Sequence, residues 1–338
     1  MHFSFAGLFG RDVGIDLGTV NTVISKRDEG IVLRERSAIA LDLEKRVVAA
    51  GDDAMLMLGR TPGQVQVIHP LQDGVVADFR LCEVLLRYFL DKAIGRAARR
   101  AGVRAVICVP GCVTDVEKRA LEEAARGAGA RTAFLMDEPV AAAIGAGLPV
   151  DEAAGTLVVD IGGGTTDAAV LALGSVVNKH SVRAGGTHID AAIMQHIRQT
   201  YGMTIGARTA EEIKLSIGAA LPGASHNMQV RGRDLRTGLP RTLELASMEI
   251  YRAILPQIMN MLSCIRALLS TTPPELSADI YERGMCLTGG GALLNGLGEF
   301  FADETGIKVY VAPSPLDCVA EGARIAVENL AFYRNRAG

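Results

Sequence analysis

The chain contains the same short motif twice. Residues 16–22 (Asp-Leu-Gly-Thr-Val-Asn-Thr) follow one hydrophobic strand, and residues 160–166 (Asp-Ile-Gly-Gly-Gly-Thr-Thr) follow another, 144 residues later. Aspartate, glycine and threonine occupy the same relative places in both copies. The simplest explanation is a duplicated domain, which predicts two similar lobes facing a shared cleft. No long Pro/Ser linker separates the copies, so we expect the lobes to be packed and hinged.

Composition narrows the possible functions. The 338 residues, 49% of them hydrophobic, suffice for two domains or one bilobal body. The net charge of -3 and the lack of a domain-wide basic stripe argue against nucleic acid as the main partner. Six scattered cysteines without a CxxC pair argue against a zinc site or a disulfide framework and fit a reducing cytosol. No uninterrupted apolar run reaches about 18 residues, so we expect no membrane-spanning helix.

Apolar runs and helical periodicities alternate along the chain. Buried strands are predicted over residues 13–15, 105–109, 156–159 and 285–287. Helices are predicted over residues 81–94, 115–128, 189–200 and 247–269, and residues 114–117 form a capping-box pattern before the second of them. This alternation favours an α/β fold whose sheets are covered on both faces.

The two repeated motifs have the composition of phosphate-binding loops. Each is predicted to end a strand and turn into a hairpin, where glycines let backbone N–H groups approach phosphate oxygens and threonine hydroxyls add donors. Asp16 and Asp160 would stand at the strand ends and hold Mg²⁺, mostly through its water ligands. An ordinary glycine-rich turn is the alternative for either loop alone, and the matched pair favours phosphate.

A third glycine run, residues 288–294 (Thr-Gly-Gly-Gly-Ala-Leu-Leu), also follows a strand. It could form a wall against an adenine and ribose, with a helix starting near Leu293. A glycine-rich strand-to-helix turn is common in any α/β protein, so this signal is weak alone. Neither a P-loop pattern nor a clear Rossmann pattern is present, which indicates a different logic of phosphate binding.

Two acidic segments have competing interpretations. Glu138 stands at a predicted strand end just before Pro139, where it could orient a water for attack on a γ-phosphate. Spacing alone favours the alternative, a carboxylate that stabilises a helix N-terminus. Residues 211–214 (Glu-Glu-Ile-Lys) lie in a helix predicted to begin after Thr209, and a surface pair of Glu211 with Lys214 is their default interpretation.

Together these segments resemble the superfamily of sugar kinases, actin and DnaK-type chaperones, and most closely the MreB family of bacterial actin-like proteins. The resemblance runs from about Asp12 to residue 330. Its segments are residues 16–22, 73–79, 114–119, 137–145, 160–167, 184–190, 237–240, 273–276 and 287–294. The nucleotide motifs are shared by the superfamily, whereas residues 73–79, 237–240 and 273–276 are much more specific to the MreB family.

The resemblance implies a duplicated ribonuclease-H-like, actin-like fold with a nucleotide cleft between two lobes, each with a small subdomain. The implied subdomains are residues 1–32 with 78–145 and 314–338 (IA), 33–77 (IB), 146–181 with 245–313 (IIA), and 182–244 (IIB).

It also implies roles for single residues. ATP would be bound by Gly18, Thr19, Val20, Asn21, Gly162, Gly163, Gly164, Gly186, Asp190, Glu211, Glu212, Ile213, Lys214, Gly289, Gly290, Gly291 and Ala292. Asp16 and Asp160 would hold Mg²⁺, and Glu138 would activate water, with Thr165 as its catalytic partner. His188 stands where relatives are expected to have an acidic or polar residue.

The function implied by the resemblance is slow ATP hydrolysis coupled to polymerisation. Antiparallel double protofilaments would lie in the cytoplasm on the inner face of the cell membrane and direct the cell-wall elongation machinery, including RodZ-, MreC- and MreD-like proteins. Phe3, Phe5, Leu8 and Phe9 would contact the membrane, or else pack on their own lobe. A monomeric sugar-kinase-type phosphotransferase and a chaperone-type nucleotide switch are the alternatives.

Overall fold

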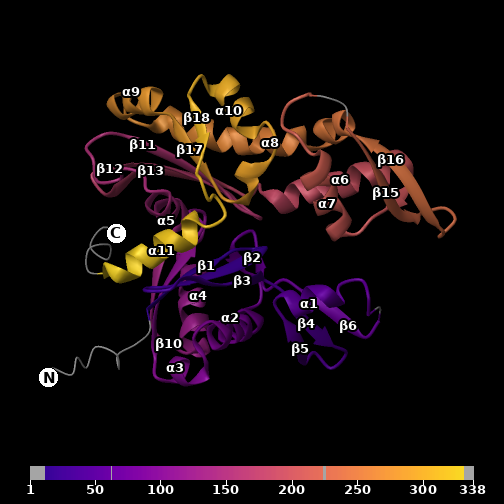
Figure 1. The fold of residues 1–338 in the computed structure, drawn as a ribbon, viewed down its shortest axis with the longest axis horizontal. Helices are drawn as coiled ribbons and strands as arrows, with labels where there is room; N and C mark the ends of the chain where they lie inside the picture. Colours follow the sequence, from indigo (N-terminus) through magenta and orange to yellow (C-terminus); the bar gives the residue numbers. More distant parts are fainter. Residues whose placement is uncertain (1–11, 62, 224–225, 331–338) are drawn as a thin grey trace. The chain divides into compact units, whose positions relative to one another are not determined.

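Two five-stranded sheets with the same topology organise the chain (Figure 1). In each sheet, three consecutive strands lie side by side. Two later strands extend the sheet beyond the first of these three and run parallel to it. The strand orders are β3-β2-β1-β9-β10 and β13-β12-β11-β17-β18. This repeated order confirms the predicted duplicated α/β fold.

The computed structural model describes residues 12–61, 63–223 and 226–330. The chain divides into two compact units. Unit 1 comprises residues up to 151, residues 173–175 and residues from 317 onward; unit 2 comprises residues 152–172 and 176–316. The finer division into four subdomains stays a prediction.

The strands at the centre of the unit 1 sheet come from apolar runs of the sequence, because side chains on both faces of the sheet are buried. Its strands are β1 (Asp12–Leu17), β2 (Asn21–Lys26), β3 (Gly30–Arg36), β9 (Val103–Val109) and β10 (Ala130–Asp137). Its helices are α2 (Phe79–Ile94), α3 (Arg96–Arg100), α4 (Asp115–Ala128), α5 (Glu138–Gly145) and α11 (Cys318–Glu328). The predicted capping box begins α4, because Thr114 Oγ1 accepts from the Glu117 amide at 3.3 Å and Glu117 accepts from the Thr114 amide at 2.8 Å.

Between β3 and β9 the chain adds a smaller sheet of order β5-β4-β6. This insertion contains β4 (Ile39–Asp42), β5 (Val47–Ala50), α1 (Asp52–Met57), β6 (Val65–Ile68), β7 (Leu71–Gln72) and β8 (Val75–Val76). The last two strands form a hairpin whose turn residues Asp73 and Gly74 both have positive φ angles.

Unit 2 repeats this plan with an insertion that contains helices and a three-stranded sheet of order β14-β15-β16. Its sheet contains β11 (Thr156–Ile161), β12 (Thr166–Ala172), β13 (Ser175–Val182), β17 (Met285–Thr288) and β18 (Val309–Val311). Between β13 and β17 lie α6 (Gly186–Tyr201), β14 (Met203–Thr204), α7 (Ala207–Ile217), β15 (Asn227–Asp234), β16 (Pro240–Ala246), α8 (Ser247–Thr271) and α9 (Pro274–Arg283). The 3₁₀ helix η2 (Gly290–Leu293) and helix α10 (Leu297–Thr305) connect β17 to β18.

Helix α8 is long and apolar enough, by length and composition, to cross a membrane. The same test is passed by core helices, and α8 is one of these: residues such as Ile250, Ile258 and Leu262 are fully buried in the hydrophobic core of unit 2. Its apolar composition is therefore explained by packing inside this unit.

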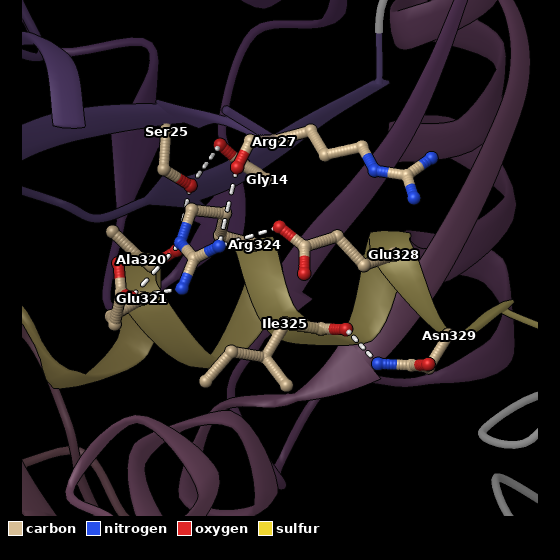
Figure 2. Close-up of polar contacts among 9 residues, drawn as sticks. All are labelled: Gly14, Ser25, Arg27, Ala320, Glu321, Arg324, Ile325, Glu328 and Asn329. Carbon is tan, nitrogen blue, oxygen red and sulfur yellow. Dashed lines mark hydrogen bonds and ion pairs between the residues drawn. The ribbon is translucent and has the colours of Figure 1, made fainter. Parts of the chain in front are cut away.

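Helix α11 is the last described element, and it packs on the first strands of unit 1 (Figure 2). Ser25 of β2 donates a hydrogen bond to the carbonyl of Ala320 at 2.7 Å and one to that of Gly14 at 3.3 Å. The guanidinium of Arg324 donates to the Arg27 carbonyl at 3.3 Å and forms ion pairs with Glu321 and Glu328. A side chain at Gly14 would collide with the backbone of α11, which explains the glycine in this strand.

Candidate functional site: two glycine hairpins and their supports

The first repeated motif is the hairpin between β1 and β2, as predicted. Residue pairing places Asp16 at the carboxyl end of β1, opposite Val23 of β2 and next to Cys108 of β9. A Cβ atom at Gly18 would lie 2.7 Å from the Asn21 carbonyl oxygen, so the loop closes this tightly only with glycine.

Ser37, just after β3, is hydrogen-bonded to the backbone carbonyl groups of this loop. Its hydroxyl donates to the Gly18 carbonyl at 2.6 Å, and its amide donates to the Val20 carbonyl at 2.9 Å. The Thr22 hydroxyl lies 2.8 Å from that of Ser37, and both residues are fully buried. Thr19 is also anchored, because its Oγ1 accepts from the Gly74 amide at 2.8 Å.

The second repeated motif is the hairpin between β11 and β12. The Gly162 amide donates to the Thr165 carbonyl at 2.9 Å across the loop. The start of α6 supports it: the Gly186 amide donates to the Gly162 carbonyl at 3.1 Å, and the amide and hydroxyl of Thr187 each donate to the Gly163 carbonyl at 2.8 Å.

Asp160, at the end of β11, lies between two other polar residues of the sheet. It pairs with Asp167 on β12 and with Thr288 on β17. Burial raises the pKa of Asp160 to about 7; the hydrogen bond donated by Thr288 at 2.8 Å opposes this shift, and the negative charge of Asp167 adds to it. A cation beside this carboxyl would favour its charged form.

The third glycine run packs on the same hairpin. Gly289 has a φ of 77°, and a Cβ there would lie 2.4 Å from the Ile161 carbonyl oxygen. A Cβ at Gly291 would lie 2.2 Å from Cγ2 of Ile161. Residues 289–292 therefore stand directly beside the predicted phosphate loop of unit 2. The predicted helix start near Leu293 is wrong: Gly290–Leu293 form the 3₁₀ helix η2, and α10 begins at Leu297.

Lys214 links α7 to the start of α6. Its ammonium lies 2.9 Å from the Asp190 carboxylate and donates to the Gly186 carbonyl at 3.2 Å. Helix α7 begins at Ala207, three residues before the predicted start after Thr209. Lys214 thus connects two predicted nucleotide residues, Asp190 and Gly186, beyond the surface pair with Glu211 that is its default interpretation.

The other residues near Lys214 have more ordinary surroundings. Ile213 is fully buried in the core of unit 2, and the exposed Glu212 pairs with Arg208 at 3.1 Å. His188 accepts a hydrogen bond from the Gly185 amide through Nδ1 at 3.2 Å, so its ring caps the start of α6. Direct nucleotide contacts by Glu211, Glu212 and Ile213 stay predictions.

Glu138 is buried at the first position of α5, immediately after β10. Residue pairing places Met136 beside Cys108 and Cys108 beside Asp16. Because β1, β9 and β10 are parallel, their carboxyl ends meet at one edge of the sheet, and this edge carries both Asp16 and Glu138. Unit 1 thereby brings two of its predicted site residues to the same place.

These residues fit a nucleotide with a hard metal ion. The collisions that side chains at Gly185, Gly289 and Gly291 would cause show that these segments pack directly against the hairpin between β11 and β12. Carboxyl and hydroxyl oxygens, as at Asp160 and Thr288, are the ligand type Mg²⁺ prefers. Among residues 12–61, 63–223 and 226–330 there is no cluster of three or more His, Cys, Asp or Glu side chains able to hold a metal ion.

Two supporting residues, Ser37 and Thr187, were missed by the sequence reasoning. Thr187 lies inside the segment 184–190 that carries the family resemblance, so a signal for it existed. Ser37 lies outside every such segment. The predicted membrane-contact residues Phe3, Phe5, Leu8 and Phe9 lie outside the described residues.

The chain is similar to known proteins along most of its length. A family model described as MreB/Mbl protein matches residues 10–335. The chain belongs to the MreB/Mbl family. Among its relatives, the cell shape-determining protein MreB of Escherichia coli K12 is 49% identical over 335 residues, covering 97% of this chain and 96% of that protein.

Two solved structures have the same fold as this chain. MreB5 of Spiroplasma citri bound to AMPPNP is 32% identical, with a TM-score of 0.90 over 96% of this chain and 98% of that one. The MamK double helical filament, 20% identical, has a TM-score of 0.80 over 95% of this chain and 99% of that one, and shows the fold alone. The fold of this MreB/Mbl protein is therefore actin-like, as predicted.

Proposed function

We propose that this chain is an actin-like ATPase whose filaments organise cell-wall elongation and cell shape. The observation that carries the proposal is the matched pair of glycine hairpins, each with an aspartate at the end of its first strand. Support comes from MreB5 of Spiroplasma citri, which was solved with AMPPNP and with ADP at a TM-score of 0.90. The family relatives named for determining cell shape support the cellular role.

The residues would divide the work as follows. Backbone amides of the two hairpin loops bind phosphate oxygens, and residues 289–292 border the adenosine. Asp16 in unit 1 and Asp160 in unit 2 are the residues that would hold Mg²⁺, which would neutralise phosphate charge. Glu138 accepts a hydrogen bond from the attacking water and orients it, and the Thr165 hydroxyl donates to the reacting phosphate.

Filament formation and membrane binding complete the proposal. Membership of the MreB/Mbl family supports self-association, which we propose takes the form of antiparallel double protofilaments. Phe3, Phe5, Leu8 and Phe9 supply an apolar segment that binds the inner face of the cytoplasmic membrane. RodZ-, MreC- and MreD-like proteins are the proposed partners there.

The catalytic part is tested with Glu138→Gln. We expect ATP turnover to fall about 100-fold or more, the usual effect of losing a general base. The dissociation constant for AMPPNP should stay within about threefold, because the amide keeps the shape of the side chain. Glu123→Gln, at an exposed position of α4, is the matched control and should leave turnover unchanged. Turnover that survives in Glu138→Gln would remove Glu138 from the mechanism.

The assembly part is tested by pelleting with Mg-ATP and anionic liposomes, followed by negative-stain electron microscopy. We expect paired filaments on lipid that require nucleotide and that weaken on lipid when residues 1–9 are deleted. A protein that stays monomeric with lipid and nucleotide, and turns over ATP only when sugars are added, would contradict the proposal and favour a sugar kinase.

A further inference from the structure

In both glycine hairpins, a loop carbonyl accepts a hydrogen bond from a side-chain hydroxyl outside the loop. In unit 1, Ser37 Oγ donates to the Gly18 carbonyl at 2.6 Å. In unit 2, Thr187 Oγ1 donates to the Gly163 carbonyl at 2.8 Å. The two hydroxyls come from different kinds of element, a loop after β3 and the first turn of α6, yet they make the same contact with corresponding loops.

This contact decides which way the loop amides face. In a planar trans peptide the C=O and the following N–H point in opposite directions. Because the Gly18 carbonyl faces Ser37, the Thr19 N–H faces away from Ser37. Because the Gly163 carbonyl faces Thr187, the Gly164 N–H faces away from α6. The Gly163 N–H does the same, since the Gly162 carbonyl accepts from the Gly186 amide.

The amides turned outward in this way are available to a ligand. Across residues 12–61, 63–223 and 226–330, the N–H groups of Thr19, Gly163 and Gly164 donate to no backbone carbonyl. Successive N–H groups that point the same way form the type of concave surface that binds anions. Glycine peptides rotate easily, so an outward orientation has to be imposed by neighbours.

We propose that Ser37 and Thr187 are positioning residues that hold the amide N–H groups of the two hairpin loops toward the phosphates of ATP. The inference rests on the proposed ATP binding and adds two residues to it. Neither residue touches the nucleotide; each acts through a loop carbonyl. Ser37 is the stronger support, because its fully buried hydroxyl contacts both Gly18 and Thr22.

The test compares Thr187→Val and Ser37→Ala with the wild-type protein. Affinity for AMPPNP with Mg²⁺ is measured by competition with a fluorescent nucleotide. We expect about a fivefold to tenfold loss for Thr187→Val, which keeps the backbone bond from residue 187, and a larger loss for Ser37→Ala. Thr187→Ser restores the hydroxyl and should return affinity to within about twofold of wild type.

A second measurement separates positioning from loss of structure. Hydrogen exchange of a peptide spanning residues 161–166 is followed with and without saturating AMPPNP. In the wild type, AMPPNP should protect this peptide; in Thr187→Val, the protection should be reduced even when the site is saturated. The matched controls Thr242→Val, at an exposed site on β16, and Ser270→Ala, which loses an exposed hydroxyl-to-carbonyl bond on α8, should behave as wild type.

The outcomes distinguish this inference from the proposed function. If the wild type binds AMPPNP and both variants bind it equally well, the positioning role is overturned and ATP binding stands. The positioning role is also overturned if Thr187→Ser is as defective as Thr187→Val. If the wild-type protein binds no AMPPNP, the proposed function fails and the inference fails with it.

Discussion

Gly185 lies so close to the unit 2 hairpin that there is no space for a side chain at this position. A Cβ atom there would lie 2.6 Å from the Gly163 carbonyl oxygen and 2.7 Å from that of Gly162. Both neighbours are backbone atoms of the predicted phosphate loop, so they cannot move without displacing it. We predict that Gly185→Ala weakens AMPPNP binding by about tenfold or more, a cost of about 1.4 kcal/mol or above, measured by nucleotide competition.

The control for Gly185→Ala is Gly206→Ala. Gly206 precedes helix α7 just as Gly185 precedes α6, but a Cβ atom there would meet nothing within 4 Å. This variant should bind AMPPNP as the wild type does. Equal binding by the two variants would show that the loop tolerates displacement.

Individual site residues could be predicted from the sequence where the residues that form the site are close together in the chain. The glycines and aspartates of the two hairpins stand next to each other in the chain, so their pattern can be read directly. The support from Ser37 could not be read in this way, because its bond to the Gly18 carbonyl depends on the pairing of three strands. The bond from Thr288 to Asp160 likewise joins residues 128 positions apart.

At the scale of elements, helices α5 and α11 approach closely through two glycines. A Cβ at Gly322 would lie 1.8 Å from the Ala141 carbonyl oxygen, and one at Gly145 would lie 1.8 Å from that of Cys318. We predict that Gly322→Ala destabilises the protein by about 1–3 kcal/mol or more, because two helix backbones must separate. Urea denaturation measures this change in the free energy of unfolding, provided that the variant and the wild type have the same m-value.

Gly298 in α10 is the matched control for Gly322. It also belongs to a helix, as the second residue of α10, but a Cβ there would meet its nearest neighbour, Val309, at an ordinary contact distance of 3.5 Å. Gly298→Ala should therefore stabilise the protein by about 0.5–1 kcal/mol through helix propensity. A similar loss of stability in both variants would argue against the close helix contact.

Elements were predictable where local signals agree. The capping box at Thr114 and the amphipathic run after it predict α4 with its observed bounds, Asp115–Ala128. The segment after β17 was not predictable in the same way. Gly289 and Gly296 take positive φ angles, and the chain between them packs on Ile161, so tertiary contact replaces the expected helix start with a 3₁₀ turn.

At the scale of the whole molecule, buried thiols make stability depend on alkaline pH. Burial raises the pKa of Cys82 and Cys264 to about 12 and that of Cys286 to about 11, above the ordinary value of 9.0. Above pH 9 the unfolded chain loses these protons and the folded chain keeps them. We predict that the free energy of unfolding falls as pH rises from 9 toward 11, by up to about 1.4 kcal/mol per pH unit for each thiol.

Urea denaturation at several pH values between 8 and about 10.5 measures this slope. Cys286→Ala should make the slope shallower, whatever it does to stability at pH 8, because one thiol no longer ionises on unfolding. Cys112→Ala, at the partly exposed cysteine, is the comparison variant. A slope unchanged by Cys286→Ala would mean that this thiol ionises equally in both states.

The packing of α11 on β1 and β2 also sets an order of events during synthesis. Unit 1 begins with the first described strand, but the helix that covers those strands is the last described element of the chain. The ribosome must translate all of unit 2 before α11 exists, which takes on the order of ten seconds or more at roughly 5–20 residues per second. During that interval the α11-facing surface of β1 is open, and nascent unit 1 is a candidate client for chaperones.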